Sequence, residues 1–265
     1  MKTVTVTIEN HIAQVTLSRP EQSNSLIFDT FKDLTEAANQ LAENNTVRVI
    51  VLTGAGKHFC AGLDRSLFPQ KPGTVDWFEE HVFNELDELA ANLFQRCVTA
   101  WQQIPIPVIA AVNGAALGGG CQVALGADIR IADATTKMSL METHWGLIPD
   151  MAVSLTLPPL MPKDVAAEIL LSARILDAQE AKATGLVTQL TDDCYASAMA
   201  LAKNIAAKSP EAIRATKKLY QAAWGEPKPE LLRLEAQLQR SLLGTSNQVE
   251  SVRANLEKRQ PVFNE

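Results

Sequence analysis

The chain has 265 residues, of which 46% are hydrophobic, 20% are charged and 5% are aromatic. This composition is that of an ordinary globular protein, so a collagen-like, low-complexity or largely disordered chain is excluded. The net charge of −6 argues against a broad basic surface for nucleic acid, and the longest apolar stretches are far below the roughly 20 residues that cross a bilayer. We expect a cytoplasmic protein that binds neither nucleic acid nor membrane.

The first elements follow from the periodicity of the apolar residues. Two alternating runs, 4–8 and 12–17, flank a polar triplet and predict a β-hairpin. Apolar residues at helical spacing predict an amphipathic helix over 25–43. A continuous apolar run at 47–52 predicts a buried strand directly after that helix.

The same order of elements then repeats along the chain. A strand at 108–112, a helix at 118–126 and a strand at 129–132 are predicted from their apolar patterns. Short buried strands that alternate with helices indicate an α/β fold with a largely parallel sheet. Between residues 64 and 104 we expect a long helical insert, whose apolar stripe contains Val75, Phe78, Val82, Leu86, Leu89, Leu93 and Val98.

Beyond about residue 160 the signals for strands fade and helical signals dominate. Pro162 is placed to open a helix through Leu171, and residues 177–180 have the form of a capping box. Ser209 before Pro210 predicts another helix start. A last amphipathic helix is marked by Leu231, Leu234, Leu238 and Leu242. We predict a core over 1–195 and a helical region over 196–265, whose apolar faces are covered by the core or by another subunit.

The cysteines and histidines form no pattern typical of metal binding or nucleophilic catalysis. His144 has no serine or cysteine at a spacing that would suggest a catalytic triad. We expect no metal site, and we expect plain buried or half-buried thiols at Cys60, Cys97, Cys121 and Cys194.

Two glycine-rich segments are candidates for ligand binding. The first, at 54–64, follows a strand, but it lacks the upstream glycine of a phosphate loop and has His58 where that loop needs Ser or Thr. The second, at 105–122, holds Gly118-Gly119-Gly120 where a strand passes into a helix. Unpaired N–H groups at such a helix start suit an oxyanion, although a glycine triplet alone is also typical of a tight structural turn.

Several motifs, in order along nearly the whole chain, resemble the enoyl-CoA hydratase/isomerase, or crotonase, superfamily. They are Leu17-Ser18-Arg19-Pro20, Phe59-Cys60-Ala61-Gly62-Leu63-Asp64, the 107–122 string, Ala127-Asp128-Ile129-Arg130-Ile131-Ala132, Gly146-Leu147-Ile148-Pro149 and Ser209-Pro210-Glu211-Ala212. The resemblance implies a spiral of ββα units, a C-terminal helical trimerisation region, and a homotrimer or dimer of trimers. It also implies an acyl-coenzyme A substrate and no further cofactor.

By motif position, the resemblance assigns an oxyanion hole and an acyl-CoA path. The backbone N–H groups of Leu63 and Gly119 would hold the thioester oxygen as it becomes an enolate, which is worth roughly 3 to 4 kcal/mol per donor in comparable enzymes. Substrate binding is expected at Gln22, Ser25, Ala61, Gly62, Asp64, Leu117 and Gly118. The coenzyme A phosphates could be met by Lys57, Arg65, Lys217 or Lys218.

The acid/base groups decide the reaction, and here the sequence departs from the family pattern. Hydratases of the family use two glutamates, and the first matching position is Gln122, whose amide cannot act as a general base. The second is Glu142, 20 residues later, which is our candidate for the catalytic acid/base. Asp150 follows eight residues after Glu142, as in dienoyl-CoA isomerases, although those also carry an acid at the place of Gln122.

We therefore favour double-bond isomerisation of an enoyl- or dienoyl-CoA, with Glu142, Asp150 and Gln122 as the catalytic set. Enoyl-CoA hydration is the alternative, and thioester hydrolysis and dehalogenation are further acyl-CoA reactions on this fold. A homologue that binds acyl-CoA without turnover is the alternative from another class, because Gln122 and residues 150–152 depart from the common pattern.

Overall fold

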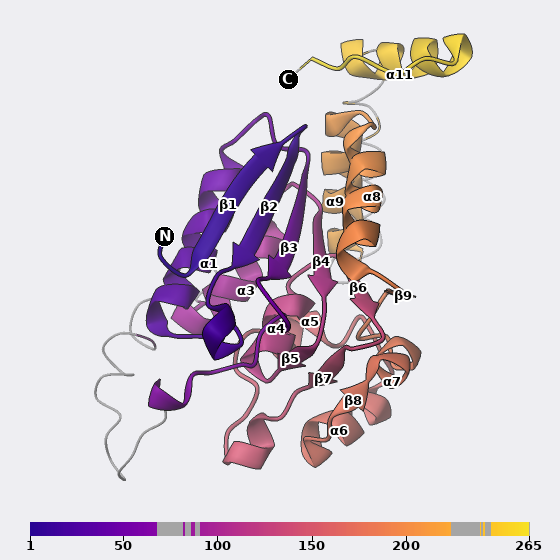
Figure 1. Cartoon of the computed structure of the whole chain (residues 1–265). Helices are drawn as coiled ribbons and strands as arrows, with labels where there is room; N and C mark the ends of the chain where they lie inside the picture. Colours follow the sequence, from indigo (N-terminus) through magenta and orange to yellow (C-terminus); the bar gives the residue numbers. More distant parts are fainter. Residues whose placement is uncertain are drawn as a thin grey trace.

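The computed structural model describes residues 1–67, 82, 86–87, 91–223, 239, 241 and 245–264. Its centre is a six-stranded sheet with the strand order β1-β2-β3-β4-β6-β9 (Figure 1). The strands are β1 (Val4–Glu9), β2 (Ile12–Leu17), β3 (Val49–Gly54), β4 (Val108–Val112), β6 (Ile129–Asp133) and β9 (Gln189–Thr191). β1 and β2 pair antiparallel and every other pair is parallel, which confirms the α/β prediction.

A second, smaller sheet lies beyond the ends of the parallel strands. It contains β5 (Ala115–Leu117), β7 (Lys137–Ser139) and β8 (Leu176–Asp177), in that order. β5 follows β4 after two residues and pairs in parallel with β7. An isolated bridge joins Cys60 to Ala116, so the loop after β3 runs beside β5. The two glycine-rich segments are thereby brought together.

Alternating side chains on the central strands feed two separate cores. On β3, Ile50 and Leu52 belong to one core, whereas Val49 and Val51 belong to the other, as the period of two of a strand requires. The first core is covered by α1 (Phe28–Ala42) and α3 (Leu93–Gln103). The second is covered by α8 (Cys194–Ala206), on the opposite side of the sheet (Figure 1).

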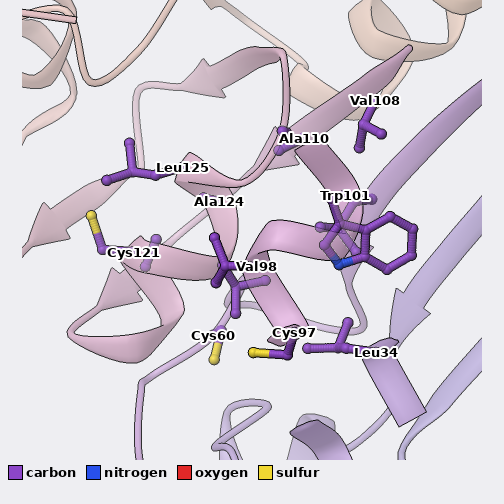
Figure 2. Packing of buried hydrophobic residues seen from close by; sticks show 14 of the residues in the cluster. Leu34, Cys60, Cys97, Val98, Trp101, Val108, Ala110, Cys121, Ala124 and Leu125 are labelled. Atoms are coloured by element: carbon purple, nitrogen blue, oxygen red, sulfur yellow. The ribbon is translucent and has the colours of Figure 1, made fainter. Parts of the chain in front are cut away.

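The first core is packed around α3. Trp101 is the largest of its fully buried side chains, and Cys97 and Val98 are also fully buried. Figure 2 shows these residues between Leu34 of α1 and Ala124 of α4 (Gly119–Leu125). At roughly 1.5–3 kcal/mol for each large buried apolar side chain, this packing holds the glycine-rich start of α4 against the rest of the core.

The caps predicted for the later helices are present. α6 spans Lys163–Ser172, one residue from the predicted bounds. At the start of α7 (Ala178–Ala183) Glu180 N donates to Asp177 Oδ1 at 2.9 Å and Asp177 N donates to Glu180 Oε2 at 3.3 Å, which confirms the capping box. α9 (Pro210–Ala222) begins as predicted, with Ala212 N donating to Ser209 Oγ.

Some short strands were not anticipated from the sequence, whereas α8 and α11 (Ser246–Glu257) fall in the region that was predicted to be helical. β8 and β9 lie after residue 160, where the sequence shows little sign of strands. They were missed because strands of two or three residues are too short to show alternation.

α8 packs closely on the sheet through Ala198, Ala202 and Ala206, which lie one turn apart. The remaining elements are η1 (Pro20–Gln22), η2 (Arg65–Leu67), η4 (Glu142–Trp145) and α5 (Val153–Thr156).

Some predictions stay untested by the structure. The leucine stripe at 231–242 and three residues of the insert stripe, Val75, Phe78 and Leu89, lie outside the described residues. Of the described residues of that stripe, Val82, Leu93 and Val98 are buried as predicted, whereas Leu86 lies outside a helix and is exposed. The division of the chain at residue 195 also stays a prediction. Among the described residues, no helix has the length and apolarity needed to cross a membrane.

Candidate active site

A cavity of about 860 Å³ opens where the loops after β3 and β4 meet η4. It is lined by residues from the two glycine-rich segments, from η1 and from the 141–151 segment. All of the catalytic and substrate-binding candidates named from the sequence lie in its wall: Gln22, Ser25, Ala61, Gly62, Leu63, Asp64, Leu117, Gly118, Gly119, Gln122, Glu142 and Asp150.

Glycine is required where the two segments touch. Gly62 has a φ of +91°, and a Cβ there would lie 2.5 Å from the carbonyl oxygen of Leu117. The same Cβ would lie 3.6 Å from the backbone nitrogen of Gly119. At Gly119 a Cβ would come within 2.9 Å of the Met151 Sδ. The two loops can approach this closely only because residue 62 has no side chain.

Two backbone donors at this contact are left for a ligand. The neighbouring N–H groups are used, since Ala61 N donates to Ser23 O, Asp64 N to Leu26 O and Gly118 N to Ser139 O. Among the hydrogen bonds of the described residues, none uses the N–H of Leu63 or Gly119. Both residues line the cavity, so their N–H groups can serve an oxygen bound there.

Glu142 stands at the start of η4 with its carboxyl group in the cavity wall. It is 9% exposed, and its Oε1 accepts a hydrogen bond from Gln122 Nε2 at 2.6 Å. Its Oε2 is buried and has no partner among the described residues. Burial raises the pKa of this carboxyl above its ordinary value, because the charged form loses water, and nearby Asp150 adds to the rise while Gln122 opposes it.

Asp150 is the second carboxylic acid of the cavity. It lies after η4 in the cavity wall, and its side chain forms no ion pair with another described residue. Burial raises its pKa as well. Two acids with raised pKa values in one cavity are typical of proton-transfer sites, since each group can hold or release a proton closer to neutral pH.

Gln122 links these two acids through the backbone. Its Nε2 donates to Glu142 and its Oε1 accepts from the Met151 N–H at 2.8 Å, directly after Asp150. The side chain is 1% exposed. An amide held at both ends cannot remove a proton, as expected from the sequence.

A different carboxylate braces the entrance. Asp64 accepts hydrogen bonds from Ser25 Oγ at 2.7 Å and from Ser66 Oγ at 2.8 Å, and pairs with Arg19 at 3.4 Å. These contacts lower the pKa of Asp64 to about 2, with the hydrogen bond from Ser25 as the largest cause. Asp64 therefore stays ionised and holds the loop, whereas Glu142 and Asp150 are poised to exchange protons.

The structure corrects one of the phosphate candidates. Lys217 is 2% exposed and its Nζ lies 2.8 Å from Asp128 Oδ2, so it is enclosed in the protein and cannot meet a phosphate in this arrangement. Arg65 lines the cavity and is exposed, whereas Lys57 and Lys218 are exposed but outside its wall.

The cysteines behave as expected, whereas His144 lies outside the cavity wall. All four cysteines are free and buried, and burial raises the pKa of Cys60 to about 12, so its thiol is not a nucleophile at neutral pH. His144 is exposed and contacts Trp145 edge-on at 5.2 Å. Trp145 lines the cavity, whereas Trp77 lies outside the described residues. Within the described part of the chain no cluster of His, Cys, Asp or Glu could hold a metal ion.

Sequence reasoning missed the apolar end of the cavity. Phe31 of α1 and Phe94 of α3 line it together, with ring centroids 4.5 Å apart. The helical spacing of Phe31 indicated only an amphipathic helix, and Phe94 was not part of any predicted pattern. The Met151 N–H was also missed, because a backbone donor 29 positions from Gln122 leaves no mark in the sequence.

Known proteins resemble this chain over almost its full length. Residues 7–265 match the family described as enoyl-CoA hydratase/isomerase. The chain is 36% identical, over 98% of its length and 93% of the other protein, to "Probable enoyl-CoA hydratase EchA12" of Mycobacterium tuberculosis. It is 32% identical, over 98% of each chain, to "(E)-benzylidenesuccinyl-CoA hydratase" of Thauera aromatica. The structure matches a crystal structure of enoyl-CoA hydratase from Bacillus anthracis with a TM-score of 0.89 and 31% identity, covering 99% of each chain.

Proposed function

Because the chain belongs to the enoyl-CoA hydratase/isomerase family and is an enzyme of that type, we propose that it moves a double bond within an unsaturated acyl-CoA. The observation that carries this proposal is that two carboxylic acids, Glu142 and Asp150, lie in one cavity without an ion-pair partner among the described residues, with an amide in the place of a third acid.

In the proposed reaction the thioester oxygen binds the N–H groups of Leu63 and Gly119. These donors are fixed before the substrate arrives, so they stabilise negative charge on the oxygen without reorganisation. The positions of Gln22, Ser25, Ala61, Gly62, Asp64, Leu117 and Gly118 in the cavity wall support a path for the coenzyme A chain towards this site.

Glu142 then removes a proton from the carbon next to the thioester. The electron pair of the broken C–H bond delocalises onto the thioester oxygen and along the adjacent double bond. A proton from Asp150, or from Glu142 itself, adds at the far end of that system, and the double bond has moved. The raised pKa values of both acids favour such exchange near neutral pH. The reaction uses only these groups and the thioester.

Hydration is the second candidate, and the names of the relatives favour it. Addition of water needs a group that takes a proton from the water while another protonates carbon. Gln122 cannot take that proton, and both ends of its amide are already engaged. Hydration would therefore require Asp150 to act on the water.

A product assay separates these functions. The protein is incubated with 2-enoyl-, 3-enoyl- and 3,5-dienoyl-CoA, and the ultraviolet band of the conjugated thioester is followed with identification of products. Isomerisation predicts that 3-enoyl-CoA gains the band and that 3,5-dienoyl-CoA yields a shifted diene. Loss of the band from 2-enoyl-CoA with a 3-hydroxyacyl product would favour hydration instead. Binding of CoA esters with no change in any of them would favour a non-catalytic role.

We also propose that residues 196–265 support assembly into a homotrimer or a dimer of trimers, and that the enzyme acts in the cytoplasm. In support of assembly, α11 contacts α9 and leaves Val249 and Val252 nearly half exposed. Sedimentation of the purified chain tests the assembly.

A further inference from the structure

We propose that Gln122 is a positioning residue that gives the two oxygens of Glu142 different tasks, so that the catalytic proton is always taken up and released at Oε2. This inference rests on the proposed function of Glu142. It adds that the chain itself, and not the substrate, selects the reactive oxygen.

The orientation of the Gln122 amide follows from its surroundings. A backbone N–H can only donate, so the atom of Gln122 that faces Met151 N at 2.8 Å must be the carbonyl oxygen. The other end of the amide is then the NH₂ group, which faces Glu142 Oε1 at 2.6 Å. Since NH₂ can only donate, Oε1 must accept.

This chain of donors disfavours a proton on Oε1. A protonated oxygen is a weaker acceptor than a carboxylate oxygen, so a proton on Oε1 would weaken the hydrogen bond that Gln122 donates to it at 2.6 Å, whereas a proton on Oε2 leaves that bond in place. When Glu142 is protonated, its proton therefore lies on Oε2, which is buried and has no partner among the described residues. The unpartnered oxygen is the one left for substrate.

Gln122 also fixes where the two acids stand relative to one another. It projects from α4, holds Glu142 of η4 by one end, and holds the backbone directly after Asp150 by the other. Because the amide is 1% exposed, water does not compete for either hydrogen bond. One side chain thereby ties together the three segments that carry the proposed chemistry.

Of the other titratable groups around Glu142, Asp150 acts in the opposite direction to Gln122, because its charge raises the pKa of Glu142. Asp150 and the buried Cys121 of α4 interact electrostatically with Glu142. His144 of η4 is exposed, as are the charged residues of the packed helix α6, which are Lys163, Asp164 and Glu168. The hydrogen bond from Gln122 favours the charged form of Glu142, so its removal is expected to raise the pKa of Glu142.

Two substitutions test the inference. Gln122→Met keeps the length of the side chain and removes both hydrogen bonds. Gln122→Glu is isosteric, so it packs where Met might not, and it places a second carboxyl oxygen against Glu142 Oε1. Both should raise the pKa of Glu142, the first by loss of a donor and the second by repulsion between like charges.

The matched control is Gln40→Met on α1. Gln40 Nε2 donates to Glu36 Oε1 at 2.9 Å, which is the same kind of contact on an exposed helix face. This variant should leave turnover and the titration of Glu142 unchanged. It reports any general effect of replacing an amide by a thioether.

Two readouts separate the inference from the proposed function. The first is the titration of Glu142 by NMR in ¹³C-glutamate-labelled protein, with the signal assigned by its loss in Glu142→Gln, and it needs no turnover. The second is the pH profile of kcat/KM. For both Gln122 variants we expect the Glu142 titration and the acid limb of the profile to move to higher pH, with kcat lower by about tenfold or more and KM changed less.

The outcomes are distinct. If both variants lower activity at every pH while the Glu142 titration stays where it is in the wild type and in Gln40→Met, Gln122 only packs and the inference is wrong. If the titration moves in both variants while the wild-type protein turns over no unsaturated acyl-CoA, the positioning role stands and the proposed function fails.

Discussion

Among the buried charged side chains of the described residues, those at the Lys217–Asp128 pair and those in the cavity are held in opposite ways. Where α9 packs on the core, Lys217 Nζ lies 2.8 Å from Asp128 and also donates to the carbonyl oxygens of Trp101 at 3.1 Å and Ile106 at 2.9 Å. Asp128 in turn accepts from Val108 N at 2.7 Å and from the hydroxyl of Tyr220. Every charge at this site is compensated.

In the cavity, by contrast, the carboxyl groups of Glu142 and Asp150 lose water on burial and no cation replaces it among the described residues. Glu142 keeps one oxygen without a partner, and Asp150 has no cation among the described residues. Such groups cost stability, because each loses water without gaining an equal contact. Burial of a charged side chain therefore does not by itself mark a reactive group. A buried charge with a full set of partners, as in the Lys217–Asp128 pair, holds two parts of the chain together. A buried carboxyl group with an oxygen left without a partner, as in Glu142, is available for chemistry.

The largest effect is expected when the ion pair between Lys217 and Asp128 is removed. Lys217→Met removes the cation and leaves Asp128 buried with one partner fewer. Removal of one member of a buried ion pair typically costs about 3–5 kcal/mol. We expect a loss of that size in the free energy of unfolding, measured with urea, while the Kd for a CoA ester is unchanged under conditions where the variant is folded. A loss below about 1 kcal/mol would show that this site is not an anchor.

The next prediction addresses the second acid of the cavity. Asp150→Asn keeps the shape of the side chain and removes its ability to exchange a proton. We expect a tenfold to hundredfold fall in the rate of isomerisation, at or below the lower limit of the range of about 10²–10⁴ for a full acid/base catalyst, because Glu142 can still move the proton, and no loss of stability. Steady-state kinetics on the best substrate check this, and an unchanged kcat would leave both proton transfers to Glu142.

A smaller effect is expected when Asp128 loses only the hydroxyl group of Tyr220. Tyr220→Phe removes only the hydroxyl that donates to Asp128. Because Asp128 keeps Lys217 and the Val108 N–H, we expect a loss of about 1 kcal/mol in the free energy of unfolding. Thermal and urea denaturation measure it. A loss as large as that of Lys217→Met would mean that the hydroxyl, not the ion pair, dominates.

The smallest effect concerns the dependence of stability on pH. Carboxyl groups whose pKa is raised in the folded protein stabilise it fully only below their ordinary values of 4.5 for Glu142 and 3.8 for Asp150, and that contribution is lost as the pH rises through the raised values. Glu142→Gln and Asp150→Asn should therefore raise Tm at pH 8 relative to the wild type, and this gain should vanish towards pH 4. An equal gain in Tm at both pH values would show that the charged forms of Glu142 and Asp150 do not destabilise the folded protein.

The elements that the sequence predicts well are those with local signals. The limits of β4 agree with the apolar run at 108–112, and the start of α9 agrees with the Ser209-Pro210 pair, because alternation and caps are properties of a few neighbouring residues. The cavity residues were found as a set because the family motifs place them. The side chains of residues 62 and 120 must be absent for the two loops to meet, since a Cβ at either position would clash with the backbone of the other loop.

What the sequence could not predict depends on contacts between distant segments. Lys217 looks like a solvated lysine until Asp128 and two carbonyl groups enclose it. The role of Gln122 depends on a backbone N–H at Met151 that no side-chain pattern reveals. In both cases the chemistry of a residue is set by a partner far along the chain, so only the folded structure identifies it.

The central claim is that Glu142 moves the proton, and Glu142→Gln tests it most directly. The substituted amide can still accept from Gln122, so the fold and the cavity shape are preserved. The account predicts that kcat on the best acyl-CoA falls by at least about a hundredfold, which is the lower limit for a general acid/base, while the Kd of a saturated acyl-CoA is unchanged. A fall of less than about tenfold, or 1.4 kcal/mol in the barrier, would contradict it.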